Sequence, residues 1–169
     1  KTPRRQRQMC IRDRYWLVYN GELFNHVALR QSLSNSGTVF LTSSDTEVLL
    51  QGLIAYGSDF IKEVNGFFAF AFYDTQTQEV LLGRDRMGIK PLYLFLSEDG
   101  LRFSSELRAL KSLGVPFHIN HQALNEYLLY SYVPEPLCLV DGIVKLSPGT
   151  TLHYSLKGGV VQSLSLIHI

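Results

Sequence analysis

The sequence predicts an α+β domain in which β-sheets are stacked between layers of helices, and three observations support this class. The 169 residues suit one sizeable domain. Apolar residues make up 46% and charged residues 18% of the chain, which is typical of a sequence that folds around a core. In the stretch FFAFAFYD (67–74) phenylalanine alternates with alanine, so both faces of the predicted strand are apolar and covered.

The first predicted elements alternate between strand and helix. The run WLVYNGE is expected to be a strand that ends in a tight corner at Asn20 and Gly21, because both residue types tolerate positive φ. Asn25 is placed to cap a helix that ends near Gly37. The run VFLT (39–42) predicts a short strand.

Capping signals and turns mark the elements that follow. Ser44 and Glu47 have capping-box spacing and open a helix that ends at Gly57, and DFIKEVNG predicts a shorter helix closed by Gly66. The runs VLLGRDR and YLFL predict strands, and EDG turns the chain into a further strand, LRFSS. SSELRALKSLG and Asn120–Tyr130 predict helices, and PEPLCLVDGIVKLSPGTTLHY predicts a loop followed by a final hairpin.

The two ends of the chain are interpreted as foreign to the domain. Arg4–Arg14 lacks apolar periodicity. It back-translates without a break to the transposon-end adapter used to build sequencing libraries. Leu164–Ile169 can be read as the reverse complement of the same DNA. We therefore expect a non-native tail at residues 1–14, a partial domain at 15–157, and a second tail at 158–169 that is adapter-derived from 164.

Composition excludes several classes of function. Without the basic N-terminal segment the chain keeps 10 basic and 14 acidic side chains, so we expect no nucleic-acid partner. No apolar run approaches the roughly 20 residues of a membrane span, and there is no signal-peptide pattern. The two cysteines are too few for a disulfide framework, which favours a cytoplasmic protein, and the scattered histidines predict no metal site.

Six motifs in order carry a resemblance to a known family. They are YNGELFNHVALR, SSDTEVLL, VNGFFAFAFYD, GRDRMGIKPLYLF, FSSELRAL and YLLYSYVPEP with GIVKLSPG. Together they resemble the glutaminase domain of glutamine-hydrolysing asparagine synthetase, a class II glutamine amidotransferase, over residues 15–157. The resemblance implies an N-terminal-nucleophile fold, a four-layer α/β/β/α sandwich, here incomplete at its N-terminus.

The resemblance assigns roles to four residues. The Asn20 carboxamide and the Gly21 backbone N–H would form the oxyanion hole and contact the glutamine carboxamide. Glu22 and Asp45 would hold the α-ammonium of glutamine. Each also has a plainer interpretation: an Asn-Gly turn, an exposed acid at a strand end, or an acid that favours the dipole of a helix N-terminus.

Other polar residues near these motifs are expected to be structural. Asn25 and His26 are interpreted as a helix cap and its neighbour, and Cys138 as a small buried apolar residue. A charge cluster around a glycine turn is interpreted as a structural ion-pair network, and comprises Arg84, Asp85, Arg86 and Lys90.

The chain departs from the family in ways that bear on activity. The family's nucleophile is an N-terminal cysteine, whereas the first residue here is Lys1, so we expect this polypeptide to be inactive as a glutaminase. The resemblance implies no cofactor in this domain, and ATP and Mg²⁺ in a C-terminal synthetase domain of the same chain, which would be the partner domain. It further implies L-glutamine as the ligand, no membrane partner, and a homodimer as a state open to the full-length enzyme.

Two alternatives remain beside the glutaminase of an asparagine synthetase. The same domain could feed ammonia to another carboxylate acceptor, or a relative of this fold could act as a non-catalytic glutaminase-like module. Amidotransferases for phosphoribosyl pyrophosphate or fructose 6-phosphate share the NG and SDTE features. They are not expected to carry the FAFAFYD and YVPEP segments.

Overall fold

Two sheets organise the chain, and each belongs to its own unit in the computed structural model, which describes residues 7–165 and the side chains of residues 9–158. The first unit runs to Lys90 and resumes at Gly149, and the second comprises Pro91–Pro148. Helices and antiparallel strands occur in both, which confirms the predicted α+β class.

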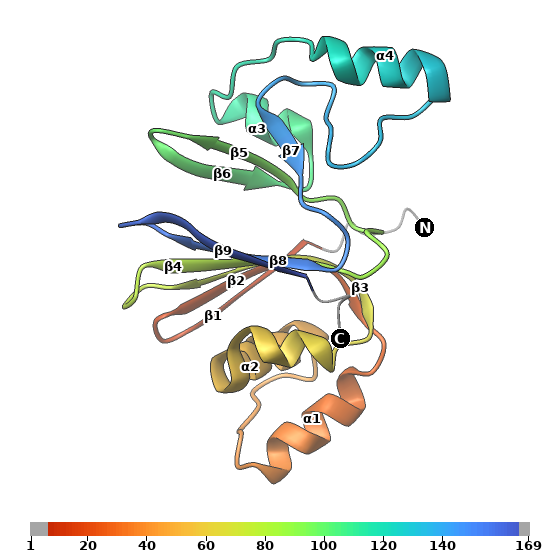
Figure 1. Cartoon of the computed structure of the whole chain (residues 1–169). Coiled ribbons are helices and arrows are strands. Elements are labelled where there is room, and N and C mark those ends of the chain that lie inside the picture. Colours follow the sequence, from red (N-terminus) through yellow and green to blue (C-terminus); the bar gives the residue numbers. More distant parts are fainter. Residues whose placement is uncertain (1–6, 166–169) are drawn as a thin grey trace. The chain divides into compact units, whose positions relative to one another are not determined.

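The first unit is built on a six-stranded antiparallel sheet with the order β1-β2-β3-β4-β8-β9 (Figure 1). Its two central pairs join β2 to β3 over nine residue pairs and β3 to β4 over six. The strands are β1 (Arg7–Arg12), β2 (Tyr15–Leu23), β3 (Gly66–Asp74), β4 (Glu79–Arg84), β8 (Thr150–Ser155) and β9 (Gly159–Ser165).

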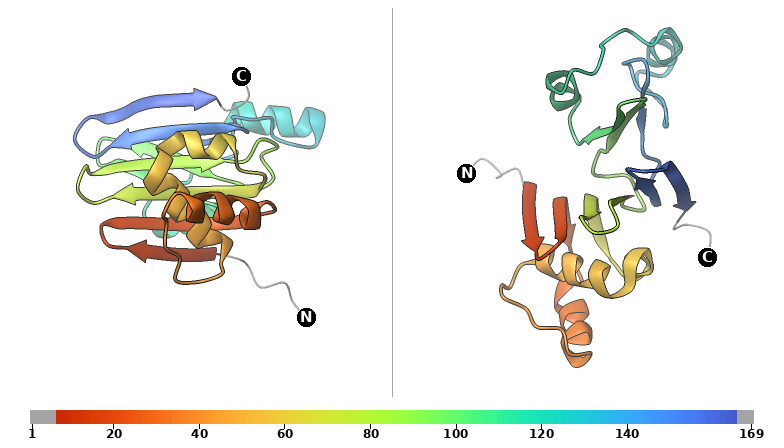
Figure 2. Two further views of the ribbon diagram at one scale, coloured as in Figure 1. Left: turned by 90° about the horizontal axis from the view of Figure 1, so that it is seen from below. Right: turned by 90° about the vertical axis from the view of Figure 1, so that its left-hand side faces the viewer.

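Helices α1 (His26–Asn35) and α2 (Asp45–Tyr56) lie across one face of this sheet, followed by the short 3-10 helix η1 (Gly57–Lys62) (Figures 1 and 2). Phe68 and Phe70 face these helices within the main core cluster. Ala69 and Ala71 lie on the opposite face and are also buried, so both faces of β3 are covered, as the alternating sequence predicts.

The predicted corner at Asn20 and Gly21 is wrong. Both residues lie inside β2, which stays paired with β3 as far as Leu23. A Cβ on Gly21 would come within 2.2 Å of the Phe67 carbonyl oxygen, so glycine is required by the close approach of β3 rather than by a turn. The turn that leaves β2 follows at Asn25 and precedes α1.

Three further predictions differ from the structure, and hydrogen bonds explain the first two. Residues 39–42 do not form a strand, because the N–H groups of Leu41 and Thr42 donate to the Glu47 carboxylate instead of to a sheet. The Asn25 side chain makes no capping bond to α1. Its Nδ2 donates to the Glu63 carbonyl, and its Oδ1 accepts from the N–H of Asn65. The segment DFIKEVNG forms η1 and a turn.

Gly66 is the first residue of β3 rather than the end of a helix. The opening and the end of α2, by contrast, are as predicted. The Glu47 N–H donates to Ser44 Oγ at 3.2 Å, and Gly57 caps the C-terminus with φ of 59°.

The charge cluster after β4 was predicted to be an ion-pair network, and its described hydrogen bonds run to the backbone. The buried Asp85 carboxylate accepts four backbone N–H groups at 3.0–3.2 Å, from Phe68, Met87, Ile89 and Lys90. The guanidinium groups of Arg84 and Arg86 donate to backbone carbonyls at 2.7–2.8 Å. These bonds fold residues 85–90 against the start of β3.

The second unit carries a three-stranded sheet with the order β6-β5-β7 and two helices. Its elements are β5 (Tyr93–Ser97), β6 (Gly100–Ser104), α3 (Leu107–Ser112), α4 (His121–Tyr130) and β7 (Ile143–Lys145). The predicted final hairpin is wrong, because β7 pairs with β5 whereas β8 pairs with β4 and forms its hairpin with β9. Cys138 is buried in the core of this unit, as predicted.

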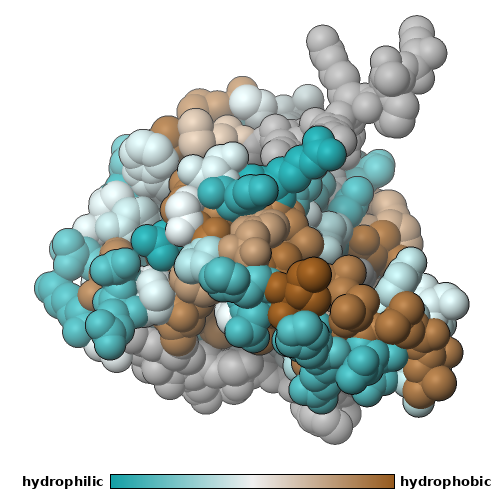
Figure 3. Space-filling model, turned by 90° about the horizontal axis from the view of Figure 1, so that it is seen from above, coloured by the Kyte–Doolittle hydropathy of each residue, from teal (hydrophilic) through white to brown (hydrophobic). Residues whose placement is uncertain are grey.

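Helix α4 is capped as predicted, since Asn120 Oδ1 accepts from the N–H of Ala123 at 3.0 Å. Ala123 is its buried residue, while Leu128 and Leu129 are more than two-thirds exposed. Apolar side chains accordingly gather on the face of the molecule seen from above (Figure 3).

Strand β1 lies inside the segment interpreted as adapter-derived, and pairs with Tyr15–Asn20 of β2. Pairing of this kind does not depend on the origin of the residues, so the adapter interpretation and the domain boundaries stay predictions. Lys1 and Arg4, and most of Leu164–Ile169, lie outside the described residues. Over residues 7–165, none of the helices combines the length and apolar character needed to cross a membrane.

Candidate functional site

The four predicted site residues lie at the end of β2 and the start of α2. Along β2, Leu17, Tyr19, Gly21 and Leu23 are buried toward the helices. Asn20 and Glu22 therefore project from the opposite face of the sheet, where Asn20 is half-buried and Glu22 is exposed. The Asn20 and Glu22 side chains thus share one face of the strand.

Asp45 is the first residue of α2, where Ser44 supplies the N-cap. Its Oδ2 accepts a hydrogen bond from the Tyr19 hydroxyl at 3.0 Å and another from the backbone N–H of Leu23 at 3.1 Å. These two bonds attach the N-terminus of α2 to the last residues of β2. The carboxylate is half-buried at this junction.

The hydrogen-bonding pattern of β2 shows which way its amides point. The N–H of Phe24 donates to Asn65 on the β3 side, whereas the N–H of Leu23 donates to Asp45 on the other edge. Successive amides along a strand alternate between its two edges, so the N–H of Gly21 points to the same edge as that of Leu23. This is the edge on which β1 pairs.

Within the described part of the chain, the pairing of β1 along this edge ends at the pair of Arg7 with Asn20. The Gly21 N–H and the Asp45 carboxylate therefore lie along one edge of β2, beyond the described β1 register. The Gly21 N–H and the Leu23 N–H that donates to Asp45 are separated by the rise of two strand residues, about 7 Å. A backbone donor and a carboxylate along one edge can bind an acceptor and a cation of the same small molecule.

The environment of Tyr19 keeps its hydroxyl protonated. Burial raises the pKa of Tyr19 far above its ordinary value, and the neighbouring charge of Asp45 and the hydrogen bond to it raise it further. The Tyr19 hydroxyl is therefore a permanent donor to Asp45 at any physiological pH.

Glu47 is a second carboxylate of α2, and its sequence pattern predicted only a place in the capping box. It is 4% exposed, and both of its oxygens accept hydrogen bonds, at 2.6–2.7 Å, from the N–H groups of Leu41 and Thr42 and the hydroxyl of Thr42. Burial acts to raise the pKa of Glu47, but these bonds outweigh it, and the pKa is lowered overall. Glu47 orders the loop before α2.

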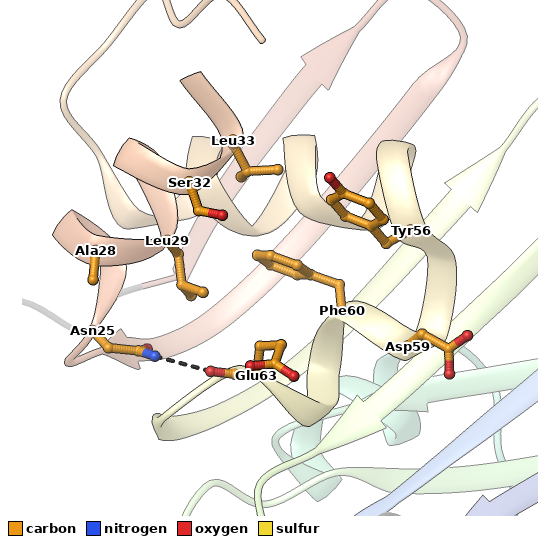
Figure 4. A pocket seen from close by; sticks show the side chains of 9 residues that line it. All are labelled: Asn25, Ala28, Leu29, Ser32, Leu33, Tyr56, Asp59, Phe60 and Glu63. Carbon is orange, nitrogen blue, oxygen red and sulfur yellow. Dashed lines mark hydrogen bonds between the residues drawn. The ribbon is translucent and has the colours of Figure 1, made fainter. Parts of the chain in front are cut away.

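A cavity of about 530 Å³ opens on the helical side of the first unit (Figure 4). It is bounded by α1, the end of α2 and η1, with the Leu29 and Phe60 side chains facing one another across it. None of the four predicted site residues lines it. Its lining consists of Asn25, Ala28, Leu29, Ser32, Leu33, Tyr56, Asp59, Phe60 and Glu63.

Neither cysteine is placed as the resemblance requires of a nucleophile. Cys10 lies in β1, opposite Leu17, and Cys138 is buried in the second unit. Burial raises the pKa of the Cys10 thiol, and the nearby charge of Glu47 adds to this, so thiolate formation is disfavoured. Among residues 9–158, no group of three or more His, Cys, Asp or Glu side chains is arranged to hold a metal ion.

Comparisons with known proteins point to one family. A family profile described as "Glutamine amidotransferase domain" matches residues 4–163. Glutamine-hydrolysing asparagine synthetase 1 of Bacillus subtilis is 36% identical over 148 residues, which cover 88% of this chain and 23% of that protein. Asparagine synthetase B of Escherichia coli is 43% identical over 95 residues, which cover 56% of this chain and 17% of that protein.

A solved structure shares the fold. The glutamine phosphoribosylpyrophosphate amidotransferase of Bacillus subtilis superposes with a TM-score of 0.66 over 97% of this chain and 32% of its own, at 24% identity. This likeness shows the fold alone. The chain spans about a quarter of the length of the asparagine synthetases that it matches over most of its residues.

Proposed function

Because the chain belongs to the glutamine amidotransferase domain family, as a class II domain related to the N-terminal domains of asparagine synthetases, we propose that it is the glutamine-binding part of such a synthetase. The observation that supports this most directly is the shared edge of β2. There, the Gly21 amide and the Asp45 carboxylate face the same side of the strand.

The Gly21 amide and the Asn20 carboxamide serve the reacting end of glutamine. Attack of a thiolate on the side-chain carboxamide carbon forms a tetrahedral intermediate, and the carbonyl electron pair moves onto oxygen as an oxyanion. N–H donors from Asn20 and Gly21 would stabilise this charge, at about 2.7–4 kcal/mol of barrier for each donor. Transfer of a proton to the amide nitrogen lets the intermediate collapse, which expels ammonia and leaves a thioester; water then hydrolyses the thioester to glutamate and the free thiol.

Asp45 and Glu22 serve the other end of the ligand, the α-ammonium. Standard bond lengths put the carboxamide carbon of an extended glutamine about 5 Å from its α-nitrogen. A ligand of this length can lie beside the edge of β2, along which the Gly21 N–H and the Leu23 N–H that donates to Asp45 are about 7 Å apart. A half-buried carboxylate is well suited to an ammonium group.

Ammonia released in this way would be used elsewhere in a longer protein. The relatives are named asparagine synthetases and are about four times the length of this chain, so we assign ATP, Mg²⁺ and the amidation of aspartate to a separate synthetase domain. The two sheets would stack between helical layers as a four-layer α/β/β/α sandwich, as in N-terminal-nucleophile hydrolases. Neither Cys10 nor Cys138 is placed for attack, so the 169-residue chain alone would not turn glutamine over.

Isothermal titration of the 169-residue chain with L-glutamine tests the proposal. We expect saturable binding that is absent with D-glutamine and weakened at least tenfold by Asp45→Asn. Ammonia release from L-glutamine should not exceed that of a heat-denatured sample. A chain that is folded by circular dichroism but binds both enantiomers equally, or neither, contradicts the proposed function. Ammonia release above the denatured control contradicts the expected inactivity.

A further inference from the structure

We propose that Tyr19 is a positioning residue for the α-ammonium site: its hydroxyl holds the Asp45 carboxylate in the orientation that receives the ammonium group of the ligand. The inference rests on the proposed function, and it adds a residue that the motifs did not single out. Tyr19 does not contact the ligand in this scheme. It acts through Asp45.

The geometry supports a role in orientation. Both hydrogen bonds to Asp45 described above converge on Oδ2, one from the Tyr19 hydroxyl and one from the Leu23 N–H. Two donors in different directions fix the plane of a carboxylate, because rotation about its side-chain bonds breaks at least one of them.

Tyr19 is well placed to impose this orientation, because its side chain is packed in the core. Its ring is 1% exposed and packs in the main core cluster beneath the helices. Its raised pKa keeps the proton on the hydroxyl, so it can only donate to the carboxylate. A donor to an ionised acceptor makes a stronger bond than one between neutral groups. The tyrosine therefore couples the rigid core to a half-exposed acid.

The comparison of two ligands separates positioning from simple stabilisation of the fold. Glutaramate has the carboxamide and the carbon chain of glutamine but lacks the α-amino group. If Tyr19 acts through Asp45 on the ammonium, Tyr19→Phe weakens L-glutamine binding about five- to tenfold and leaves glutaramate binding unchanged. Tyr154→Phe is the matched control, since Tyr154 is also buried in this unit, on β8, and should leave both affinities unchanged.

Titrations of the wild-type chain, Tyr19→Phe, Tyr154→Phe and Asp45→Asn with both ligands decide between the outcomes. If Tyr19→Phe lowers the affinity for L-glutamine and for glutaramate equally, the hydroxyl only supports the fold, and this result overturns the inference. Wild-type affinity for L-glutamine in Tyr19→Phe overturns it as well, while the proposed function stands if Asp45→Asn still loses binding. Absence of glutamine binding to the wild-type chain removes both proposals.

Discussion

Two aspartates that lie beside strand ends of the same sheet, Asp85 after β4 and Asp45 at the start of α2, have very different hydrogen-bond partners. Asp85 follows β4, is 1% exposed, and uses both carboxylate oxygens to accept four backbone N–H groups. Asp45 lies next to the end of β2 and is half-buried. Its single oxygen Oδ2 accepts both of its described hydrogen bonds. The first carboxylate is saturated by the protein, and the second is oriented by it.

The difference distinguishes an acid that builds a loop from the acid that we propose receives the ammonium group of a ligand. Saturation of a buried carboxylate by backbone donors compensates for the loss of water and leaves little capacity for other partners. Glu47 belongs with Asp85, since both of its oxygens accept bonds from residues 41 and 42. The two acids of α2, although only two positions apart, thus have opposite roles.

Asp85→Asn should produce the largest effect on stability. The new amide group can accept on only one side, so two of the four backbone donors lose their acceptor and face an N–H group instead. Each unsatisfied buried donor costs about 1–3 kcal/mol, and we expect the free energy of unfolding to fall by about 4 kcal/mol. Urea denaturation followed by circular dichroism measures this change. A loss below about 1 kcal/mol would contradict the structural role assigned to the carboxylate.

Glu47→Gln should cost less, about 2 kcal/mol, because one oxygen still accepts while the other is replaced by a donor. The lowered pKa of Glu47 adds a pH dependence. The unfolded chain takes up the proton near the ordinary value of 4.5, before the folded chain does, so this residue's contribution is present above that pH and is lost as the pH falls below it.

The unfolding free energy of Glu47→Gln should therefore depend less on pH than that of the wild-type chain between about pH 5 and 3. Urea denaturation at several pH values measures both slopes. Parallel slopes for the two proteins would show that the hydrogen bonds from residues 41 and 42 do not favour the ionised form of Glu47.

Asp45→Asn should change stability by about 1 kcal/mol or less, since the oxygen of the amide can still accept from Tyr19 and Leu23. Its effect should instead appear in ligand binding, as the loss of L-glutamine affinity described above. Urea denaturation and titration on the same sample give both quantities. A large loss of stability with unchanged affinity would place Asp45 with Asp85, as a structural acid.

The sequence predicted the elements that depend on local signals. The capping box at Ser44, the glycine stop at Gly57 and the alternation of FFAFAFYD were each confirmed, because a few adjacent residues suffice to specify them. Predictions based on neighbouring residues failed where distant ones decide. Gly21 suggested a turn, yet its reason is the backbone of β3, which lies more than forty positions further along the chain.

The candidate site divides in the same way. Asn20, Gly21, Glu22 and Asp45 were predicted from their motifs, and the structure adds that the Gly21 amide and Asp45 lie on one edge of β2. Tyr19 was not predicted, because its hydrogen bond to Asp45 spans 26 positions and no local pattern records it. From the sequence alone, an aromatic residue that precedes Asn-Gly on a buried face is predicted to be an ordinary core residue.

Asn20→Ala should have the smallest effect on stability and on ligand affinity. It tests whether Asn20 acts on the reaction, whereas Asp45 acts on ligand binding. Asn20 is half-buried and lies on the face of β2 opposite the main core, so its loss should change the free energy of unfolding by about 0.5 kcal/mol or less. A donor of the oxyanion hole acts on charge that develops only in the transition state, so L-glutamine affinity should stay within about twofold of wild type. Titration alongside Asp45→Asn measures the difference. A loss of affinity comparable to that of Asp45→Asn would mean that Asn20 binds the ground state of the ligand. This would contradict the assignment of Asn20 to the transition state and of Asp45 to ligand binding.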